Sequence, residues 1–177
     1  MVVKSKTADN LIADLEETFQ NLKKFQWKLN RTKCIFGVPS GILLGNVVSR
    51  HGIKANPEKI EAVTKMKPLT SVKDVQKLMG CMVALSHFIS RLGEKGLPFF
   101  KLLKTSEKFT WTPEANKAFA ELKHFLTTPP VMMAAKAGET LLIYIAATNH
   151  VVSTAIVVER EEAGHAYKVQ CPIYFIS

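Results

Sequence analysis

Cysteine is scarce in this chain, and its cysteines are not spaced for a disulfide framework. There are three, Cys34, Cys81 and Cys171, an odd number that includes no CxxC pair, whereas disulfide-rich domains and zinc motifs use closely spaced pairs. The first residues, Met1 to Lys6, also lack the long apolar run of a secretory signal. We therefore expect a reducing location, in the cytoplasm or the nucleus.

Recognisable catalytic motifs are missing as well. The five histidines form no HExxH or HxxxH pair, and no glycine-rich segment is followed by GK[ST], so the sequence matches neither zinc hydrolases nor P-loop proteins. Two-metal polymerases and nucleases need several converging carboxylates, yet the expected strands are nearly free of Asp and Glu. The residues by themselves indicate no catalytic set and no metal site.

Positive charge is abundant but unevenly distributed. Twenty-four Lys and Arg oppose 15 Asp and Glu, which gives a net charge of +9. Residues 1–50 and 51–100 each carry +4, residues 101–150 carry +2, and residues 151–177 carry −1. A basic surface attracts polyanions such as nucleic acids. A solvated lysine surface explains the same charge, so both interpretations stay open at this point.

Hydrophobic periodicity predicts several helices. The first runs from Thr7 to about Lys28, with apolar residues at helical spacing that predict one buried face. Capping residues mark the starts of three further helices, and a fourth follows a break predicted at Gly93–Gly96. The three capped helices are expected from Asn56-Pro57 to before Pro68, from Ser71 with Asp74 to near Leu92, and from Thr112-Pro113 to before Pro129-Pro130. The fourth is expected at Leu97–Leu103.

Short apolar runs predict strands on either side of this helical part. Cys34–Val38 and Ile42–Val48 flank Pro39-Ser40-Gly41, which favours a hairpin turn. Three further strands are expected at Thr140–Ala147, Val152–Glu159 and Tyr167–Ile176. The uncharged run Leu141–Val158 is long enough for a membrane span, but its polar centre favours two strands and a turn, so no membrane association is expected. The fold class predicted is α+β.

The expected helix from Ser71 has two different faces. One is apolar and predicts core packing; its members are Leu78, Met82, Leu85, Ile89 and Leu92. The other is flat in the middle and basic at its ends; its members are Lys73, Gln76, Gly80, Val83, Ala84, His87 and Arg91. A mid-helix glycine costs about 1 kcal/mol relative to alanine, which indicates a close approach at Gly80. Either another helix or a nucleic-acid groove would explain it.

Several sequence blocks, taken together and in order, resemble the pol polyprotein of gypsy-type LTR retrotransposons, particularly those of plants. The blocks are Leu29 to Val38, Leu44 to Ser49, Gly52 to Ile60, Val75 to Gly80 with Phe88-Ile89-Ser90, Phe109-Thr110-Trp111 with Ala118-Phe119 and Leu122-Lys123, and Leu141 to Val157 with Pro172 to Ser177. They extend over essentially the whole chain.

The resemblance implies a fragment of reverse transcriptase in three parts. Residues 1–54 would be a palm remnant of one helix and a β-hairpin, residues 55–107 a helical thumb, and residues 108–177 a truncated three-stranded sheet of an RNase H-like, connection-type domain. In the family, a Tyr-x-Asp-Asp strand with two metal-binding aspartates precedes a segment similar to Val2–Lys6. The polymerase aspartates would then lie outside this chain, and the fragment is expected to be inactive.

The resemblance also implies a binding partner, the RNA/DNA template–primer. The hairpin that ends at Leu44-Gly45 resembles the primer grip, and the helix that contains Gln76, Lys77 and Gly80 resembles the thumb helix that follows the minor groove. Ala84 would be the contact one turn further on, where retroviral enzymes carry a bulky aromatic residue. Lys73, His87 and Arg91 would meet phosphates.

The C-terminal part departs from an active RNase H in one respect. By the resemblance, Ala146 stands where the first strand normally carries a metal-binding aspartate, and a methyl group cannot coordinate Mg²⁺. No cofactor is expected on this fragment, although the complete family enzyme would use Mg²⁺. The open edge of the short sheet predicts self-association. A domesticated, non-enzymatic nucleic-acid-binding protein and a pseudogene product without selected function are alternative readings.

Overall fold

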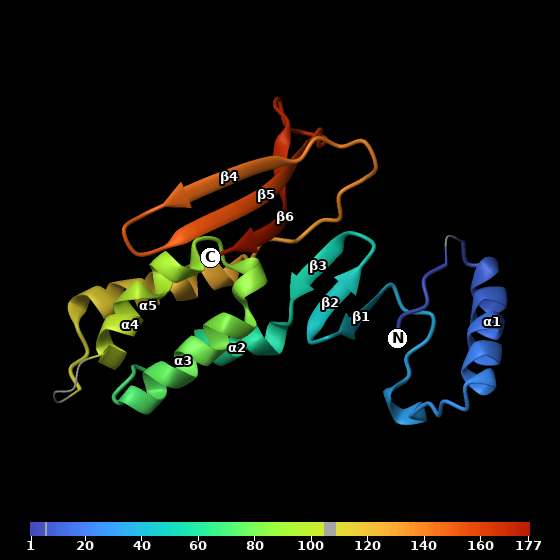
Figure 1. Ribbon diagram of the computed structural model, residues 1–177, viewed down its shortest axis with the longest axis horizontal. Coiled ribbons are helices and arrows are strands. Elements are labelled where there is room, and N and C mark those ends of the chain that lie inside the picture. The colour runs from blue at the N-terminus through green and yellow to red at the C-terminus, as the bar shows by residue number, and fades with distance from the viewer. Residues whose placement is uncertain (6, 105–108) are drawn as a thin grey trace.

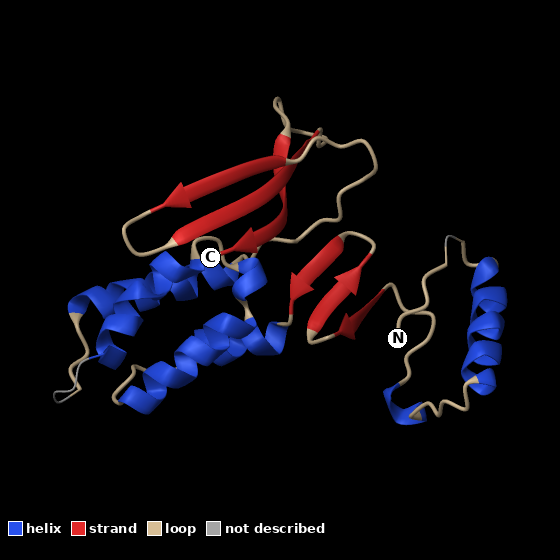
Figure 2. Ribbon diagram, viewed as in Figure 1, coloured by secondary structure: helices blue, strands red, loops and turns tan. Residues whose placement is uncertain are grey.

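The computed structural model describes residues 1–5, 7–104 and 109–177. Within these ranges the chain combines helices with two antiparallel sheets of three strands each (Figures 1 and 2), so the predicted α+β class is confirmed. The helices are α1 (Asn10–Lys24), α2 (Pro57–Thr64), α3 (Val72–Ala84), α4 (Leu92–Lys104) and α5 (Pro113–Thr127). The strands are β1 (Ser40–Leu43), β2 (Asn46–Ser49), β3 (Gly52–Ala55), β4 (Leu142–Ala147), β5 (Val152–Arg160) and β6 (Val169–Ile176).

The N-terminal helix α1 lies at one end of the molecule, away from the other helices (Figure 1). It is shorter than the expected Thr7–Lys28, and none of its residues is buried. Phe19 is 42% exposed and Ile12 is 77% exposed. The predicted helix is therefore confirmed, whereas the predicted burial of its apolar face is wrong, because the described chain covers that face only in part, for example by the edge-on contact of Phe36 with Phe19 at 6.3 Å between ring centroids.

The first sheet is a meander in the order β1-β2-β3. Leu43 pairs with Asn46, so the hairpin turn is Leu44-Gly45 and the predicted turn at Pro39-Ser40-Gly41 is wrong. Ser40 and Gly41 already belong to β1. A two-residue hairpin needs positive φ at its central positions, and Gly45 meets that requirement at little cost, whereas Pro39 cannot.

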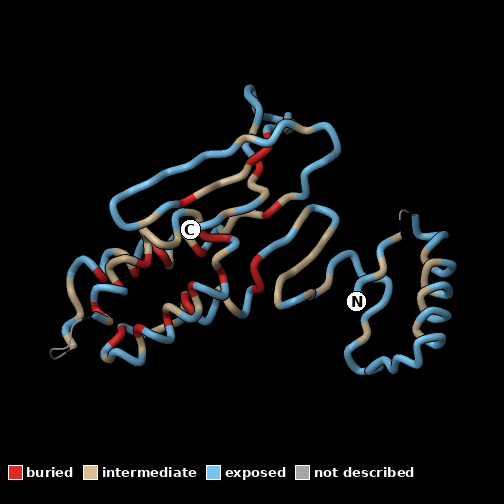
Figure 3. Tube along the Cα trace, viewed as in Figure 1, coloured by how far each residue is buried: buried red, intermediate tan, exposed pale blue. Residues whose placement is uncertain are grey.

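The hydrophobic core is built by α2, α3, α4 and α5 (Figure 3). Its largest fully buried side chains are Phe88, Phe99, Leu78, Met82, Leu85, Ile89, Leu122 and Leu126. The three predicted caps are confirmed: Asn56, Ser71 and Thr112 each accept a hydrogen bond from a backbone N–H of the first helical turn. Sixteen of the buried residues, from Ala55 to Met132, form one cluster.

The long helix expected from Ser71 to Leu92 is interrupted. α3 ends at Ala84, a 3-10 turn η2 (Ser86–Phe88) follows, and α4 begins at Leu92. The predicted break at Gly93–Gly96 and the separate helix from Leu97 are wrong, because α4 runs through both glycines. Packing explains this: a Cβ on Gly93 would lie 2.6 Å from a Val151 methyl carbon, so the helix is placed where only glycine fits.

The second sheet has the order β4-β5-β6, and the three predicted strands are confirmed with shifted ends. The run Leu141–Val158 forms β4, a turn and part of β5, and no described helix is long and apolar enough to cross a membrane. The boundary predicted between residues 107 and 108 lies outside the described residues. α5, beyond it, packs against α2 and α4.

The segment between α5 and β4, residues 128–141, forms hydrogen bonds with both sheets. Met132 exchanges two backbone hydrogen bonds with Ile53 of β3, at 2.8 and 2.9 Å. The next residue, Met133, donates its N–H to the Pro172 carbonyl of β6 at 2.8 Å. Further along, Glu139 accepts two hydrogen bonds from Arg160 of β5, each 2.7 Å. This segment therefore fixes the second sheet against the first sheet and the helices.

Candidate nucleic-acid interface

The face of α3 that points away from the core carries most of the predicted contacts. Val75, Leu78 and Met82 are buried on the opposite side of the helix. The outer face is exposed along its whole length, and its residues are Lys73, Gln76, Lys77, Gly80, Val83 and Ala84. We call this set the α3 outer face. The two faces alternate in Figure 3 as stretches of buried and exposed chain, as the helical spacing predicts.

Gly80 lies at the centre of the α3 outer face. A Cβ added there would have no atom of the described residues within 4 Å apart from its chain neighbours and the backbone of its own helix. Glycine in a helix interior lowers stability by about 1 kcal/mol relative to alanine. Because no neighbour in the described chain requires the missing side chain, helix packing does not account for Gly80. Close packing of another helix on Gly80, one of the two explanations offered from the sequence, is therefore wrong for the described residues.

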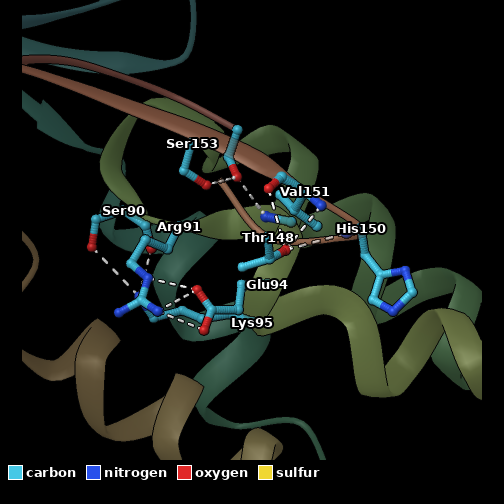
Figure 4. A network of polar contacts seen from close by, with 10 residues as sticks. Ser90, Arg91, Glu94, Lys95, Thr148, His150, Val151 and Ser153 are labelled. Carbon is cyan, nitrogen blue, oxygen red and sulfur yellow. Dashed lines mark hydrogen bonds and ion pairs between the residues drawn. The ribbon is translucent and has the colours of Figure 1, made fainter. Parts of the chain in front are cut away.

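The basic residues predicted at the two ends of this surface differ in whether they form ion pairs. Lys73 and Lys77 are exposed and form no ion pair with any described residue. Arg91 lies beyond α3, in a left-handed conformation with φ of 55°, and donates to both carboxylate oxygens of Glu94, with Nε at 2.6 Å from Oε2. Figure 4 shows this pair. The charge of Arg91 is thus partly neutralised by Glu94, unlike the charges of Lys73 and Lys77.

His87 belongs to η2, because the helix has ended before it. It is exposed, and its ring lies 5.2 Å from the ring of Tyr174 on β6, measured between centroids. Sequence reasoning included His87 and missed Tyr174, since 87 positions separate them and no pattern links them. The structure brings His87, three residues beyond the α3 outer face, together with Tyr174.

The hairpin tip with Leu44 and Gly45 is the second predicted contact region. Both residues have positive φ, 50° and 74°, the requirement of a type I′ turn. Leu44 is 91% exposed, so a bulky apolar side chain occupies a strained position in full contact with solvent. A Cβ on Gly45 would lie 3.0 Å from the Lys59 amine, which places a positive charge beside the turn.

The part of the chain that the structure describes holds no metal-binding cluster near these surfaces. Among the described residues there is no group of three or more His, Cys, Asp and Glu side chains able to hold a metal ion. Ala146 lies on β4, exposed and paired with Ser153 of β5.

Comparison with curated proteins shows a similarity to retrotransposon polyproteins. It is 24% identical over 169 residues to the Transposon Tf2-3 polyprotein of Schizosaccharomyces pombe, and it matches the Tf2-4 polyprotein equally well. The resemblance to LTR retrotransposon polyproteins is confirmed. The alignment includes 96% of this chain but only 13% of the relative. No protein-family model matches the chain.

Solved structures show the same fold. The foamy viral protease–reverse transcriptase in complex with an RNA/DNA hybrid aligns with a TM-score of 0.76 and 18% identity, over 97% of this chain and 23% of the viral one. A second structure, the same viral enzyme termed dRH with double-stranded DNA, aligns with a TM-score of 0.77 over 98% of this chain and 30% of the other. The fold is therefore that of a segment of a reverse transcriptase.

Proposed function

We propose that this chain is the part of a retrotransposon reverse transcriptase that holds the template–primer duplex, with the α3 outer face as its main contact. The observation that carries the proposal is Gly80. It is an exposed mid-helix glycine with no neighbour in the described chain, at the centre of a surface with Lys73 and Lys77 near one end. A glycine there lets a polynucleotide backbone approach the helix closely, while the two lysines bind phosphates.

The comparisons support this proposal through the ligands of the structural neighbours. The viral enzymes with the same fold were solved with an RNA/DNA hybrid and with double-stranded DNA. The hairpin tip supplies the second contact in the proposal, with the exposed Leu44 side chain against the primer and Lys59 beside Gly45. Binding of this kind would suit either a polyprotein segment or a domesticated binding protein.

We propose that the segment contributes contact but no bond-making step. A two-metal polymerase or nuclease requires carboxylates that converge on the ions, and the described residues contain no such cluster. Ala146, which the resemblance aligns with a metal-binding aspartate, offers no oxygen ligand. Mg²⁺ would belong to the complete enzyme. Primer extension with Mg²⁺ or Mn²⁺ tests this, and robust nucleotide incorporation by the isolated chain would contradict it.

Salt-dependent titration tests the binding proposal. The wild-type chain is titrated with a fluorescent RNA/DNA hybrid at several salt concentrations, beside the double variant Lys73→Ala/Lys77→Ala. Each lost phosphate contact lowers the slope of log K against log salt by about one, so the double variant should lose about two. The matched control is Lys23→Ala/Lys24→Ala, which removes the same charge from α1 at the other end of the molecule (Figure 1).

The outcomes separate a specific face from general basicity. A reduced slope of log K against log salt in Lys73→Ala/Lys77→Ala, but not in Lys23→Ala/Lys24→Ala, supports the proposal. Equal losses in the two variants would show that net charge, rather than the α3 outer face, binds the hybrid. Absence of binding by the wild-type chain at low salt would overturn the proposed function.

We also propose self-association through the edge strand β4. Three large side chains in it are more than 45% exposed, Ile143, Tyr144 and Ile145, and the strand pairs only with β5 among the described strands. An unpaired edge can add an identical strand in antiparallel fashion, which makes a self-complementary two-fold interface. A second copy of this chain is therefore the occupant that we propose.

Light scattering across a concentration series tests this interface. The wild-type chain should show a concentration-dependent rise in mass, and Ile145→Lys should abolish it because an edge lysine opposes strand addition. Ile12→Lys is the control, since Ile12 is an equally exposed apolar residue on α1. A rise in mass that only Ile12→Lys abolishes would move the interface to α1 and contradict the proposal.

A further inference from the structure

The α3 outer face does not end with the helix. Ala84 is followed by η2, and His87 of η2 contacts Tyr174 of β6 with ring centroids 5.2 Å apart and planes inclined by 37°. η2 and β6 pack against each other. A surface that begins on the thumb-like helix therefore continues, through two aromatic rings, onto the second sheet.

Tyr174 is suited to contact a ligand as well as its neighbour. The residue is 40% exposed, and its hydroxyl forms no hydrogen bond with any described residue. Tyr144 provides a contrast on the same sheet, since its hydroxyl accepts a hydrogen bond from Gln170 at 2.7 Å. The ring of Tyr174 is thus held by His87 while its donor group stays available.

We infer that Tyr174, positioned by His87, is a further nucleic-acid contact that binds the sugar–phosphate backbone beyond the end of α3. The inference rests on the proposed function, because it extends the same duplex track. Tyrosine hydroxyls commonly donate to phosphate and sugar oxygens, and such contacts fix the register of a duplex without reading its sequence. In an RNA strand the 2′-hydroxyl is an additional partner.

The inference predicts that binding depends on the length of the duplex. The stretch from Lys73 to Ala84 rises about 17 Å along the helix at 1.5 Å per residue. At about 3.4 Å per step of the nucleic-acid strand, it covers about five base pairs. A duplex of about six pairs is only slightly longer than the helical part of the surface, whereas one of about twelve is long enough to cover the helix and Tyr174 together, so we expect only the longer duplex to use both contacts in full.

The experiment compares hairpin-capped RNA/DNA hybrids of these two lengths. Tyr174→Phe keeps the ring against His87 and removes only the hydroxyl, so the melting temperature should not change. It should weaken binding of the long hybrid about three- to tenfold, the value of one hydrogen bond, and leave the short hybrid unaffected. The salt slope should also stay unchanged because no cation is lost. Tyr167→Phe, with Tyr167 87% exposed in the loop before β6, is the matched control.

The possible failures can be told apart. If the wild-type chain binds neither hybrid, the proposed function fails and this inference fails with it. If the wild type binds but Tyr174→Phe binds the long hybrid equally well, the inference alone is overturned. Equal weakening for both lengths, or for Tyr167→Phe as well, would likewise contradict a contact beyond the end of α3.

Discussion

Two amphipathic helices of this molecule, α1 and α3, have different environments although both carry apolar residues at helical spacing. α1 has 15 residues and none is buried. α3 has 13, and its residues Val75, Leu78 and Met82 are buried against α2 and α4. The difference shows that apolar spacing predicts a helix and its apolar face, while burial depends on which other elements the chain supplies.

The two helices also begin differently. At α3, Ser71 accepts from the Asp74 N–H and Asp74 accepts from the Ser71 N–H, which completes a capping box. The Ser71 side chain, with backbone N–H groups of Thr70 and Ser71, lowers the pKa of the Asp74 carboxyl. At α1, Asp9 makes no capping hydrogen bond through its side chain. Local and tertiary interactions thus both favour α3.

The largest expected contrast is in the response to truncation of an apolar side chain. Leu78→Ala removes a fully buried side chain and should lower the free energy of unfolding by about 2 to 5 kcal/mol. Ile12→Ala, at an apolar residue of α1 that is 77% exposed, should cost less than about 0.5 kcal/mol. Urea unfolding followed by circular dichroism measures both values. Similar losses would show that α1 is buried in solution and would break the comparison.

A smaller contrast is expected at the helix caps. Ser71→Ala should destabilise the chain by about 1 kcal/mol, because a first-turn N–H loses its acceptor. Asp9→Ala should leave stability nearly unchanged, since the Asp9 side chain caps nothing. The same unfolding experiment measures both, and a larger loss for Asp9→Ala than for Ser71→Ala would contradict the assignment of the caps.

The smallest expected effect is a change in the pH dependence of stability at low pH. Arg160, followed by the Lys136 backbone N–H, lowers the pKa of Glu139 from 4.5 to about 2. This carboxylate therefore stabilises the folded chain above pH 4.5, and its contribution is lost as the pH falls from 4.5 toward 2. Glu139→Gln should lower the melting temperature slightly at neutral pH, by less than Ser71→Ala does, and flatten its decline below pH 4.5. Parallel pH profiles of variant and wild type would disprove a role for this pair.

Local signals in the sequence account for much of the fold. Asn56, Ser71 and Thr112 begin helices as their capping chemistry predicts, and the polar centre of Leu141–Val158 becomes the turn between β4 and β5. The outward position of Gln76 and Gly80 also follows from helical spacing, because the buried residues of α3 define the opposite face. These features depend on neighbours within one or two turns of the chain.

Features that depend on distant contacts could not be predicted in this way. Gly93 lies within α4 because Val151, far along the chain, occupies the space of a side chain. The interruption after Ala84 places Phe88 and Ile89 in the core, and periodicity alone does not detect it. The contact between His87 and Tyr174 joins η2 to β6, so only the folded chain reveals it.

Gly80→Leu tests the central claim most directly, because stability and binding should change in opposite directions. Leucine at this open, exposed position should stabilise α3 by up to about 1 kcal/mol, while its side chain should block close approach of the duplex. The measurement is the affinity for the long RNA/DNA hybrid, with the melting temperature as a control on folding. We predict at least tenfold weaker binding by a chain that melts no lower than wild type. Unchanged affinity in that stabilised chain would contradict the proposal that the α3 outer face holds the template–primer.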